Sequence, residues 1–198
     1  MEIRGAGELL GEDQSGQIQQ IGFSLYSEYL QRAVSAMQAG EDPDQDMVRQ
    51  RIAEVELHLP ALIPDDYLAD VHARLTLYKR IASAESDEAL RELQVEMIDR
   101  FGLLPPPVNN LFEVSKLRQR ARAMGITRID LSKQGGSLEF EEETLADPDA
   151  LFRLMTLHPG RYRLAGPQRL VVRLEDADAS ERLAFASALL DQLSPATH

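Results

Sequence analysis

The sequence predicts an α+β domain with a mainly antiparallel sheet, built from hairpins and packed with several amphipathic helices. One observation is that apolar residues recur at three- and four-residue steps in several segments, as on one face of a helix. A second is that short alternating segments in the C-terminal half come in pairs separated by glycine-containing turns. Strands paired in hairpins, with most helices grouped elsewhere, favour this class over a parallel α/β sheet.

The composition excludes several classes of protein. The chain has 198 residues, is 43% hydrophobic, and contains neither Cys nor Trp. A chain of this length can bury about 70% of the surface that its unfolded form exposes, so it needs no crosslinks. The lack of Cys excludes a disulfide scaffold, a thiolate metal site and a Cys nucleophile. No run approaches the roughly 20 apolar residues of a membrane span, so we expect a cytoplasmic protein with no membrane partner.

The N-terminal quarter differs in character from the rest. Residues 1–22 are Gly-rich, polar and poorly periodic, which indicates turns and short helical pieces. Apolar side chains then recur at helical spacing from Phe23 to Met37, before Gly40 and the charged run EDPDQD. We therefore predict three regions, which are 1–22, a linker helix with an acidic linker at 23–50, and a domain at 51–198.

The predicted domain begins with a strand and three helices. The strand, residues 54–59, alternates with Val55, Leu57 and Leu59 on one face and ends before a proline. The helical faces are Leu68, Val71, Leu75, Tyr78 and Ala82 in the first; Leu90, Leu93, Met97 and Phe101 in the second; and Leu111, Val114, Leu117, Ala121 and Met124 in the third. Such stripes must pack on one another or on a sheet.

Two hairpins follow. The first pairs a strand with Ile129 and Leu131 against one with Leu138 and Phe140, and Gly135–Gly136 are expected to supply its turn. The second pairs residues 162–164 with residues 170–174 around a turn at Gly166–Pro167.

Two helices complete the predicted domain. Asp147, followed by Pro148, has the pattern of an N-cap and first helical residue. Asp178 with Glu181 three residues later is typical of a capping box, and it opens a final helix that ends near Leu193.

The sequence predicts no catalytic residue, metal site or cofactor in this chain. No GK[ST] triplet is present, so the chain lacks a nucleotide-phosphate loop. No serine lies in a G-x-S-x-G context. The four histidines lie far apart and never at metal-ligand spacing. They are His58, His72, His158 and His198.

The formal net charge of −12 is unevenly distributed. Residues 1–50 have a balance of −6 and residues 51–100 a balance of −5, while residues 151–198 have a balance of +1. The acidic half favours basic protein surfaces as partners, with solubility as the simpler interpretation. One basic cluster, on the third helix of the domain, is Lys116, Arg118, Arg120 and Arg122. It is either a solvated flank or a weak contact for phosphate or an acidic partner.

The N-terminal segment carries the most specific pattern. Residues 4–16 read RGAGELLGEDQSG and resemble the translocation motif shared by the bacterial transcription-repair coupling factors and the RecG translocases. Three later segments resemble the coupling factors and not the RecG translocases. They read IGFSLYSEYLQRAV, EVELHLPALIPDDYLADVHARLTLYKRIASA and ELQVEMIDRFGLLPPPVNNL. The resemblance covers nearly the whole chain and is strongest over residues 2–34 and 54–105.

This resemblance implies that the chain is the C-terminal piece of an ATP-driven DNA translocase whose nucleotide-binding motifs lie upstream. Such a parent uses ATP and Mg, binds duplex DNA, releases stalled RNA polymerase and recruits the excision-repair protein UvrA. In the motif, Arg4 and Gln14 would couple ATP turnover to movement, and Glu8 would be a helix-surface partner. The residues that would shape its hairpin and loop are Gly5, Gly7, Gly11, Ser15 and Gly16.

The resemblance also implies a role for the C-terminal domain. In the family this domain packs against the UvrB-like N-terminal module of the same protein, hides the UvrA-binding surface and restrains the motor. We therefore expect an autoinhibitory domain without enzymatic activity of its own. The alternative is an accessory nucleic-acid-contacting domain that uses the basic cluster and a second group of arginines, Arg161, Arg163, Arg169 and Arg173.

Overall fold

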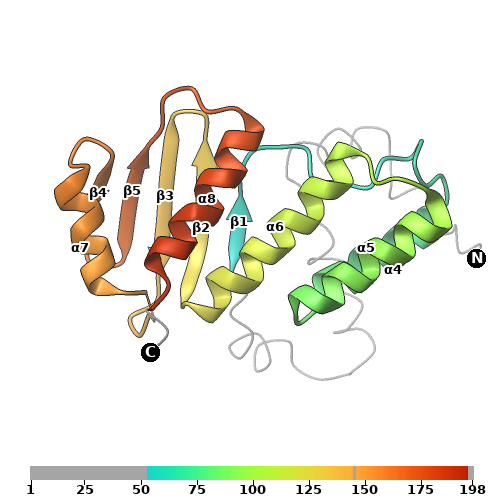
Figure 1. The fold of residues 1–198 in the computed structure, drawn as a ribbon, viewed down its shortest axis with the longest axis horizontal. Coiled ribbons are helices and arrows are strands. Elements are labelled where there is room, and N and C mark those ends of the chain that lie inside the picture. The colour runs from blue at the N-terminus through green and yellow to red at the C-terminus, as the bar shows by residue number, and fades with distance from the viewer. Residues whose placement is uncertain (1–52, 145, 196–198) are drawn as a thin grey trace, which may run out of the picture.

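The computed structural model describes residues 53–144 and 146–195, which form five helices and a five-stranded sheet (Figure 1). In chain order the elements are β1 (Glu54–Glu56), α4 (Val71–Ala82), α5 (Asp87–Phe101), α6 (Pro106–Ala123), β2 (Ile126–Ser132), β3 (Gly135–Phe140), α7 (Pro148–Leu157), β4 (Tyr162–Leu164), β5 (Arg169–Arg173) and α8 (Ala179–Leu193). The expected translocation motif, the helix from Phe23 to Met37 and the boundaries at 22 and 50 lie outside the described residues.

The sheet confirms the predicted α+β class. Its strand order is β1-β2-β3-β5-β4, and three of the four pairings are antiparallel. The exception is β1, which joins β2 in parallel because the chain between them crosses over through three helices. One row of side chains across the sheet faces the helices and consists of Val55, Ile129, Leu138 and Leu170.

Two apolar clusters divide the described part into a helical half and a sheet half. The helical half contains α4, α5 and the first two turns of α6, where Val108 and Phe112 are fully buried. The sheet half contains the strands, α7, α8 and the rest of α6, where Leu117 and Ala121 pack toward the sheet. Helix α6 lies between the sheet and the α4–α5 pair (Figure 1) and belongs to both clusters.

The predicted helix caps are confirmed. The Asp178 side chain accepts a hydrogen bond from the Glu181 backbone N–H, while the Glu181 carboxylate accepts one from the Asp178 N–H. Asp147 caps α7 ahead of Pro148. These local bonds satisfy N–H groups that the first helical turn leaves without partners, which explains why sequence patterns located these two helix starts. The structure adds a third cap, Ser86 at the start of α5.

The predicted strand 54–59 is wrong in length, because β1 ends at Glu56. His58 has a positive φ of 51°, which takes the chain out of the extended region. The carbonyl oxygens of Leu57 and His58 accept hydrogen bonds from the Arg182 side chain, so they are not available to a neighbouring strand.

The predicted inner face of the first helix is confirmed in part, since Leu68 and Tyr78 are buried. Helix α4 starts at Val71 with Asp70 as its N-cap, and its other buried residues, Leu77 and Ile81, were not predicted. Val71 is 59% exposed. The side-chain hydroxyl of Tyr78 accepts a hydrogen bond of 2.5 Å from the backbone N–H of Ile63. This contact fastens the buried side of α4 to the loop before the helix.

The turn of the first hairpin lies two residues earlier than predicted. Lys133 and Gln134 form it, and Gly135 and Gly136 begin β3 instead. A Cβ atom at Gly135 would overlap the Val172 carbonyl oxygen of β5. These glycines are therefore required by close strand packing, whereas the hairpin is present as predicted.

Candidate interaction surfaces

The face of the sheet opposite α6 and α8 is polar. Strand register places Glu54, Arg128, Glu139 and Arg169 side by side in one row across β1, β2, β3 and β5. The neighbouring row consists of Glu56, Asp130, Ser137, Val171 and Arg163. Since side chains alternate between the two faces of a strand, both rows lie away from the apolar core. We call this surface the open face.

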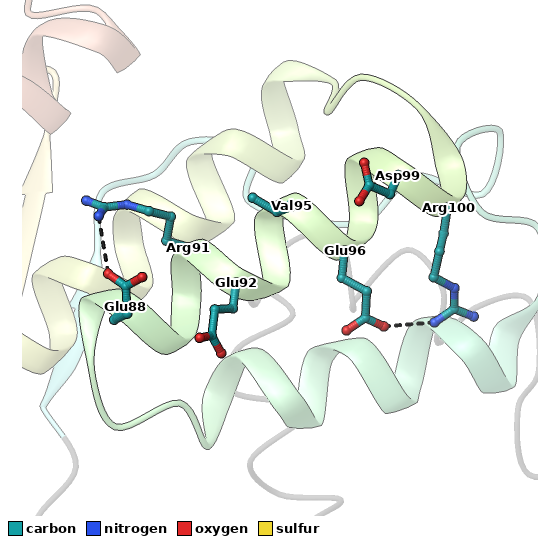
Figure 2. A pocket seen from close by; sticks show the side chains of 7 residues that line it. All are labelled: Glu88, Arg91, Glu92, Val95, Glu96, Asp99 and Arg100. Atoms are coloured by element: carbon teal, nitrogen blue, oxygen red, sulfur yellow. Dashed lines mark hydrogen bonds and ion pairs between the residues drawn. The ribbon is translucent and has the colours of Figure 1, made fainter.

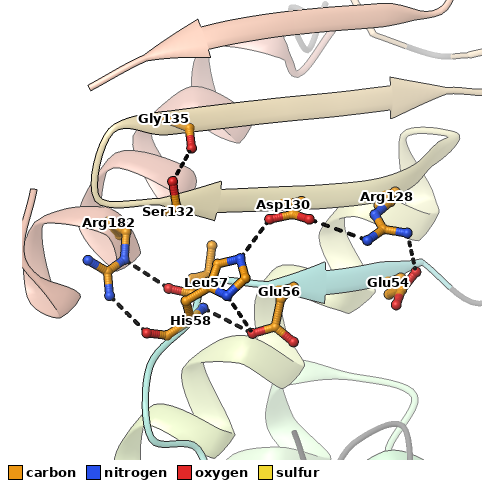
Figure 3. Close-up of polar contacts among 9 residues, drawn as sticks. All are labelled: Glu54, Glu56, Leu57, His58, Arg128, Asp130, Ser132, Gly135 and Arg182. Carbon is orange, nitrogen blue, oxygen red and sulfur yellow. Dashed lines mark hydrogen bonds and ion pairs between the residues drawn. The ribbon is translucent and has the colours of Figure 1, made fainter. Parts of the chain in front are cut away.

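The β1–β2 side of the open face holds a connected polar network (Figure 3). Arg128 bridges Glu54 and Asp130 with two N–O distances of 3.3 Å. His58 reaches the other oxygen of Asp130 with its Nε2 atom at 2.8 Å, and its backbone N–H donates to Glu56 at 3.0 Å. The nearby carboxylates, Glu54 foremost, raise the pKa of Arg128. Each charged side chain of the network contacts another member of it, so this side offers few groups without a partner.

Arg182 is a buried cation that links the ends of the sheet half. It is only 4% exposed, and its guanidinium donates to three carbonyl oxygens, those of Leu57 at 2.8 Å, Ala177 at 2.6 Å and His58 at 3.0 Å. Figure 3 shows two of these bonds beside the polar network. The fork geometry of Arg allows one side chain to fasten α8 to the chain leaving β1. This role is structural.

On the helical half, Glu96 of α5 is held between two arginines. Arg80 of α4 donates two hydrogen bonds to its carboxylate, at 2.8 and 2.6 Å, and Arg100 donates a third at 2.9 Å. The Arg80 bonds first, and then the Arg100 bond, lower the pKa of Glu96 to about 2. The carboxylate therefore stays ionised and paired at neutral pH, which joins α4 to α5 at the surface.

A shallow hollow runs along α5 (Figure 2). Its lining residues are Glu88, Arg91, Glu92, Val95, Glu96, Asp99 and Arg100. Val95 is 53% exposed within it, Ile98 one turn further is 40% exposed, and Leu103 just after the helix is 86% exposed. Apolar side chains next to paired charges are typical of a protein-contact surface and untypical of a catalytic cleft. We call Val95, Ile98, Leu103 and the hollow the α5 surface.

The basic cluster predicted on α6 does not form a common surface. Lys116 pairs with Glu113 of its own helix at 2.7 Å. Arg120 donates to the Ser187 hydroxyl at 3.0 Å and pairs with Asp191, both on α8. The expectation of a solvated flank is thus wrong for Arg120, because the adjoining helix supplies its partners. Arg122 is exposed.

The other arginine group divides between the two sides of the sheet. Arg161 lies over the ring of Phe185, 4.7 Å from its centroid, on the helix side. Arg163, Arg169 and Arg173 are exposed and lie on the open face by strand register.

The remaining predictions concern absent groups and the motif. Among the described residues, no cluster of three His, Asp or Glu side chains could hold a metal ion. No helix in that part of the chain is both long and apolar enough to cross a membrane. The motif side chains lie outside the described residues, namely Arg4, Gly5, Gly7, Glu8, Gly11, Gln14, Ser15 and Gly16.

Known proteins match this fold and these residues. The model of the TRCF domain family matches residues 57–151, which run from the end of β1 into α7. The transcription-repair-coupling factor of Escherichia coli (strain K12) is 45% identical over 193 residues, covering 98% of this chain. Its counterpart from Haemophilus influenzae is 48% identical over 190 residues, covering 96%. The chain belongs to the transcription-repair coupling factor family.

The chain corresponds to only a part of its relatives, and its match to a solved structure concerns the fold. The chain spans 17% of the length of the Escherichia coli and Haemophilus influenzae proteins. A crystal structure of the C-terminal domain of a transcription-repair coupling factor matches with a TM-score of 0.58 and 24% identity. That match covers 72% of this chain and 94% of the other, and it shows a shared fold.

Sequence reasoning missed the contacts that join distant segments. The Glu96–Arg100 pair has the i, i+4 spacing of a helical ion pair and could have been found. Arg182 lies four residues before buried Ala186, so helical spacing alone places it on the buried face of α8. His58 and Asp130 are 72 residues apart, and no local pattern signals their contact.

Proposed function

We propose that this chain contributes the C-terminal regulatory domain of an ATP-dependent DNA translocase that releases stalled RNA polymerase and recruits UvrA. The observation that carries the proposal is the TRCF domain match over residues 57–151, which includes the whole helical half from Ile63 to Phe112. The domain itself would have no enzymatic activity. It would act by covering the UvrA-binding surface on the UvrB-like N-terminal module of the same protein.

The α5 surface supports this role because it combines uncovered apolar side chains with acidic ones. Val95 lines the hollow together with Glu92 and Asp99, and Leu103 is exposed just after the helix, in the half of the chain where acidic residues dominate. A basic module with an apolar centre would complement it in both respects. Tethering within one protein gives a high effective concentration, so the contact can be weak enough to open when polymerase competes.

Deletion in the full-length parent tests the masking role. Removing residues 66–198 takes away α4 to α8, and we expect higher ATPase activity and tighter UvrA binding. A matched parent with the domain intact but Phe152→Ser, an exposed change on α7, should behave as wild type. Unchanged UvrA affinity after the deletion would contradict masking.

We also propose that the translocation motif couples ATP and Mg turnover in the parent to movement on duplex DNA. Its support is the resemblance of residues 4–16. Arg4→Ala and Gln14→Ala should each slow polymerase displacement in the full-length protein, whereas Arg49→Ala in the acidic linker should not. Intact displacement in both motif variants would show that the motif is assigned wrongly.

The alternative, an accessory nucleic-acid-contacting domain, receives little support from α6. Its Lys116 and Arg120 already have carboxylate partners, so few cations remain there for phosphates. Titration of the chain with duplex DNA and, separately, with the UvrB-like module distinguishes the masking role from the nucleic-acid-contacting role. Salt-sensitive DNA binding without module binding would favour the alternative.

A further inference from the structure

Three arginines of the open face form a regularly spaced group. Arg169 and Arg173 lie on β5, four residues apart and therefore about 13 Å apart along the strand. Arg163 of β4 is paired in register with Val171, midway between them. The three side chains thus follow the strand direction in steps of about 6.6 Å, twice the rise of one residue. We call Arg163, Arg169 and Arg173 the arginine trio.

The arginine trio has no partner among residues 53–144 and 146–195. None of its three guanidinium groups forms an ion pair or side-chain hydrogen bond with any residue of the described chain. Arg128, on the same face, bridges two carboxylates. The trio surrounds Val171, a half-buried side chain that gives it an apolar centre. Exposed unpaired arginines around an apolar residue are well suited to bind carboxylates.

Acidic residues lie next to the trio in the sheet and at both ends of it. Glu139 of β3 lies opposite Arg169 of β5, and the acidic run Glu141–Glu143 directly follows β3. At the other end, Glu175 and Asp176 come two and three residues after Arg173 and are exposed. A long polyanion such as duplex DNA would meet these carboxylates on leaving the trio, whereas a short acidic peptide would not.

We propose that the arginine trio binds a short extended protein segment that carries acidic side chains at alternate positions. Side chains at i, i+2 and i+4 of an extended segment lie on one face with the same 6.6 Å step as the trio, so each carboxylate meets one arginine. The intervening positions leave Val171 free to contact the segment backbone. This site goes beyond the masking contact, since it lies in the sheet half and not on the α5 surface.

Peptide binding to the 198-residue chain tests the site. The probe is a fluorescein-labelled nine-residue peptide with three Asp at alternate positions among Thr and Ser. The control peptide has the same composition with its three Asp contiguous. We expect the alternating peptide to bind at least fivefold more tightly at 50 mM salt, and to lose at least tenfold in affinity at 300 mM salt.

Matched variants locate the binding. Replacing all three trio arginines with Gln should weaken peptide binding at least tenfold, while Arg122→Gln on α6, also exposed and unpaired within the described chain, should change it less than twofold. Circular dichroism melting confirms that each variant folds. Equal binding of the two peptides, or an equal loss in Arg122→Gln, would overturn the site. Trio-dependent binding of a 20-base-pair duplex in place of the peptide would assign the trio to nucleic acid and would also overturn it.

Discussion

The α5 surface and the open face differ in whether their charged side chains have partners. On the α5 surface, Glu96 is fully paired with Arg80 and Arg100, while Val95 and Leu103 remain uncovered. The open face carries few apolar side chains, because the apolar row of the sheet is buried on the helix side. Its arginine trio remains without partners in the described chain. Within the part of the chain that the structure describes, the α5 surface lacks an apolar partner and the arginine trio lacks a carboxylate partner.

This difference indicates two kinds of contact within one domain. Burial of apolar area depends little on salt, whereas attraction between exposed charges is screened within about 8 Å at physiological ionic strength. A partner on the α5 surface should therefore stay bound as salt rises, and one on the arginine trio should dissociate. The following changes test how independent the two halves are, beginning with the largest expected effect.

Phe112→Ala should destabilise the domain by about 3–5 kcal/mol, because Phe112 is fully buried and its removal leaves a cavity. Since α6 contributes to both apolar clusters, urea unfolding should remain one transition that shifts as a whole. Phe152→Ala, at an exposed position on α7, should change the free energy of unfolding by less than about 0.5 kcal/mol. Two separate transitions in Phe112→Ala would show that the halves unfold independently.

Arg182→Met should cost about 2–3 kcal/mol, since three carbonyl oxygens lose their donor while the side-chain volume is nearly kept. The effect belongs to the sheet half, where Arg182 fastens α8 to the end of β1. Chemical denaturation followed by circular dichroism measures it. Arg153→Met removes an exposed arginine from α7 and is the matched control, with an expected change below about 0.5 kcal/mol. Equal losses in both variants would contradict the role of Arg182.

The sequence predicted most of what local rules control. The capping box of Asp178 and Glu181 and the hairpins depend on residues close in the chain, and they are present. The predicted end of the first strand was wrong because Arg182, more than 120 residues away, binds the carbonyls of Leu57 and His58. The predicted face of α4 was right for Tyr78 but missed Leu77 and Ile81, which pack on the other helices of the helical half.

The candidate surfaces show the same division. The i, i+4 spacing on α5 indicates the Glu96–Arg100 pair, and the alternation of side chains on β5 indicates that Arg169 and Arg173 share a face. The sequence predicted that β4 pairs with β5, but it did not predict the register that brings Arg163 level with Val171. That pairing converts scattered arginines into a group with a regular step.

Glu96→Gln should reduce stability at neutral pH by about 1 kcal/mol or less, because the ion pairs of Glu96 are partly solvated. The folded pKa of Glu96 is about 2, below its ordinary value of 4.5. Its stabilising contribution is therefore complete above pH 4.5 and is lost as the pH falls toward 2. Urea unfolding at several pH values should show a weaker dependence in this range for Glu96→Gln than for Glu92→Gln, since Glu92 forms no ion pair within the described chain. Identical pH profiles would contradict the pairing.

Leu103→Ser should have the smallest effect on stability, below about 0.5 kcal/mol, because the side chain is 86% exposed and packs on little. If the α5 surface contacts the UvrB-like module, the same change should weaken binding of that module at least threefold at both low and high salt. Leu157→Ser on α7 is matched in residue type and is 70% exposed, so it controls for loss of an exposed leucine. The comparison separates the two surfaces, because a loss confined to Leu103→Ser places the contact on the apolar α5 surface. A loss in Leu157→Ser alone would move the contact to the sheet half.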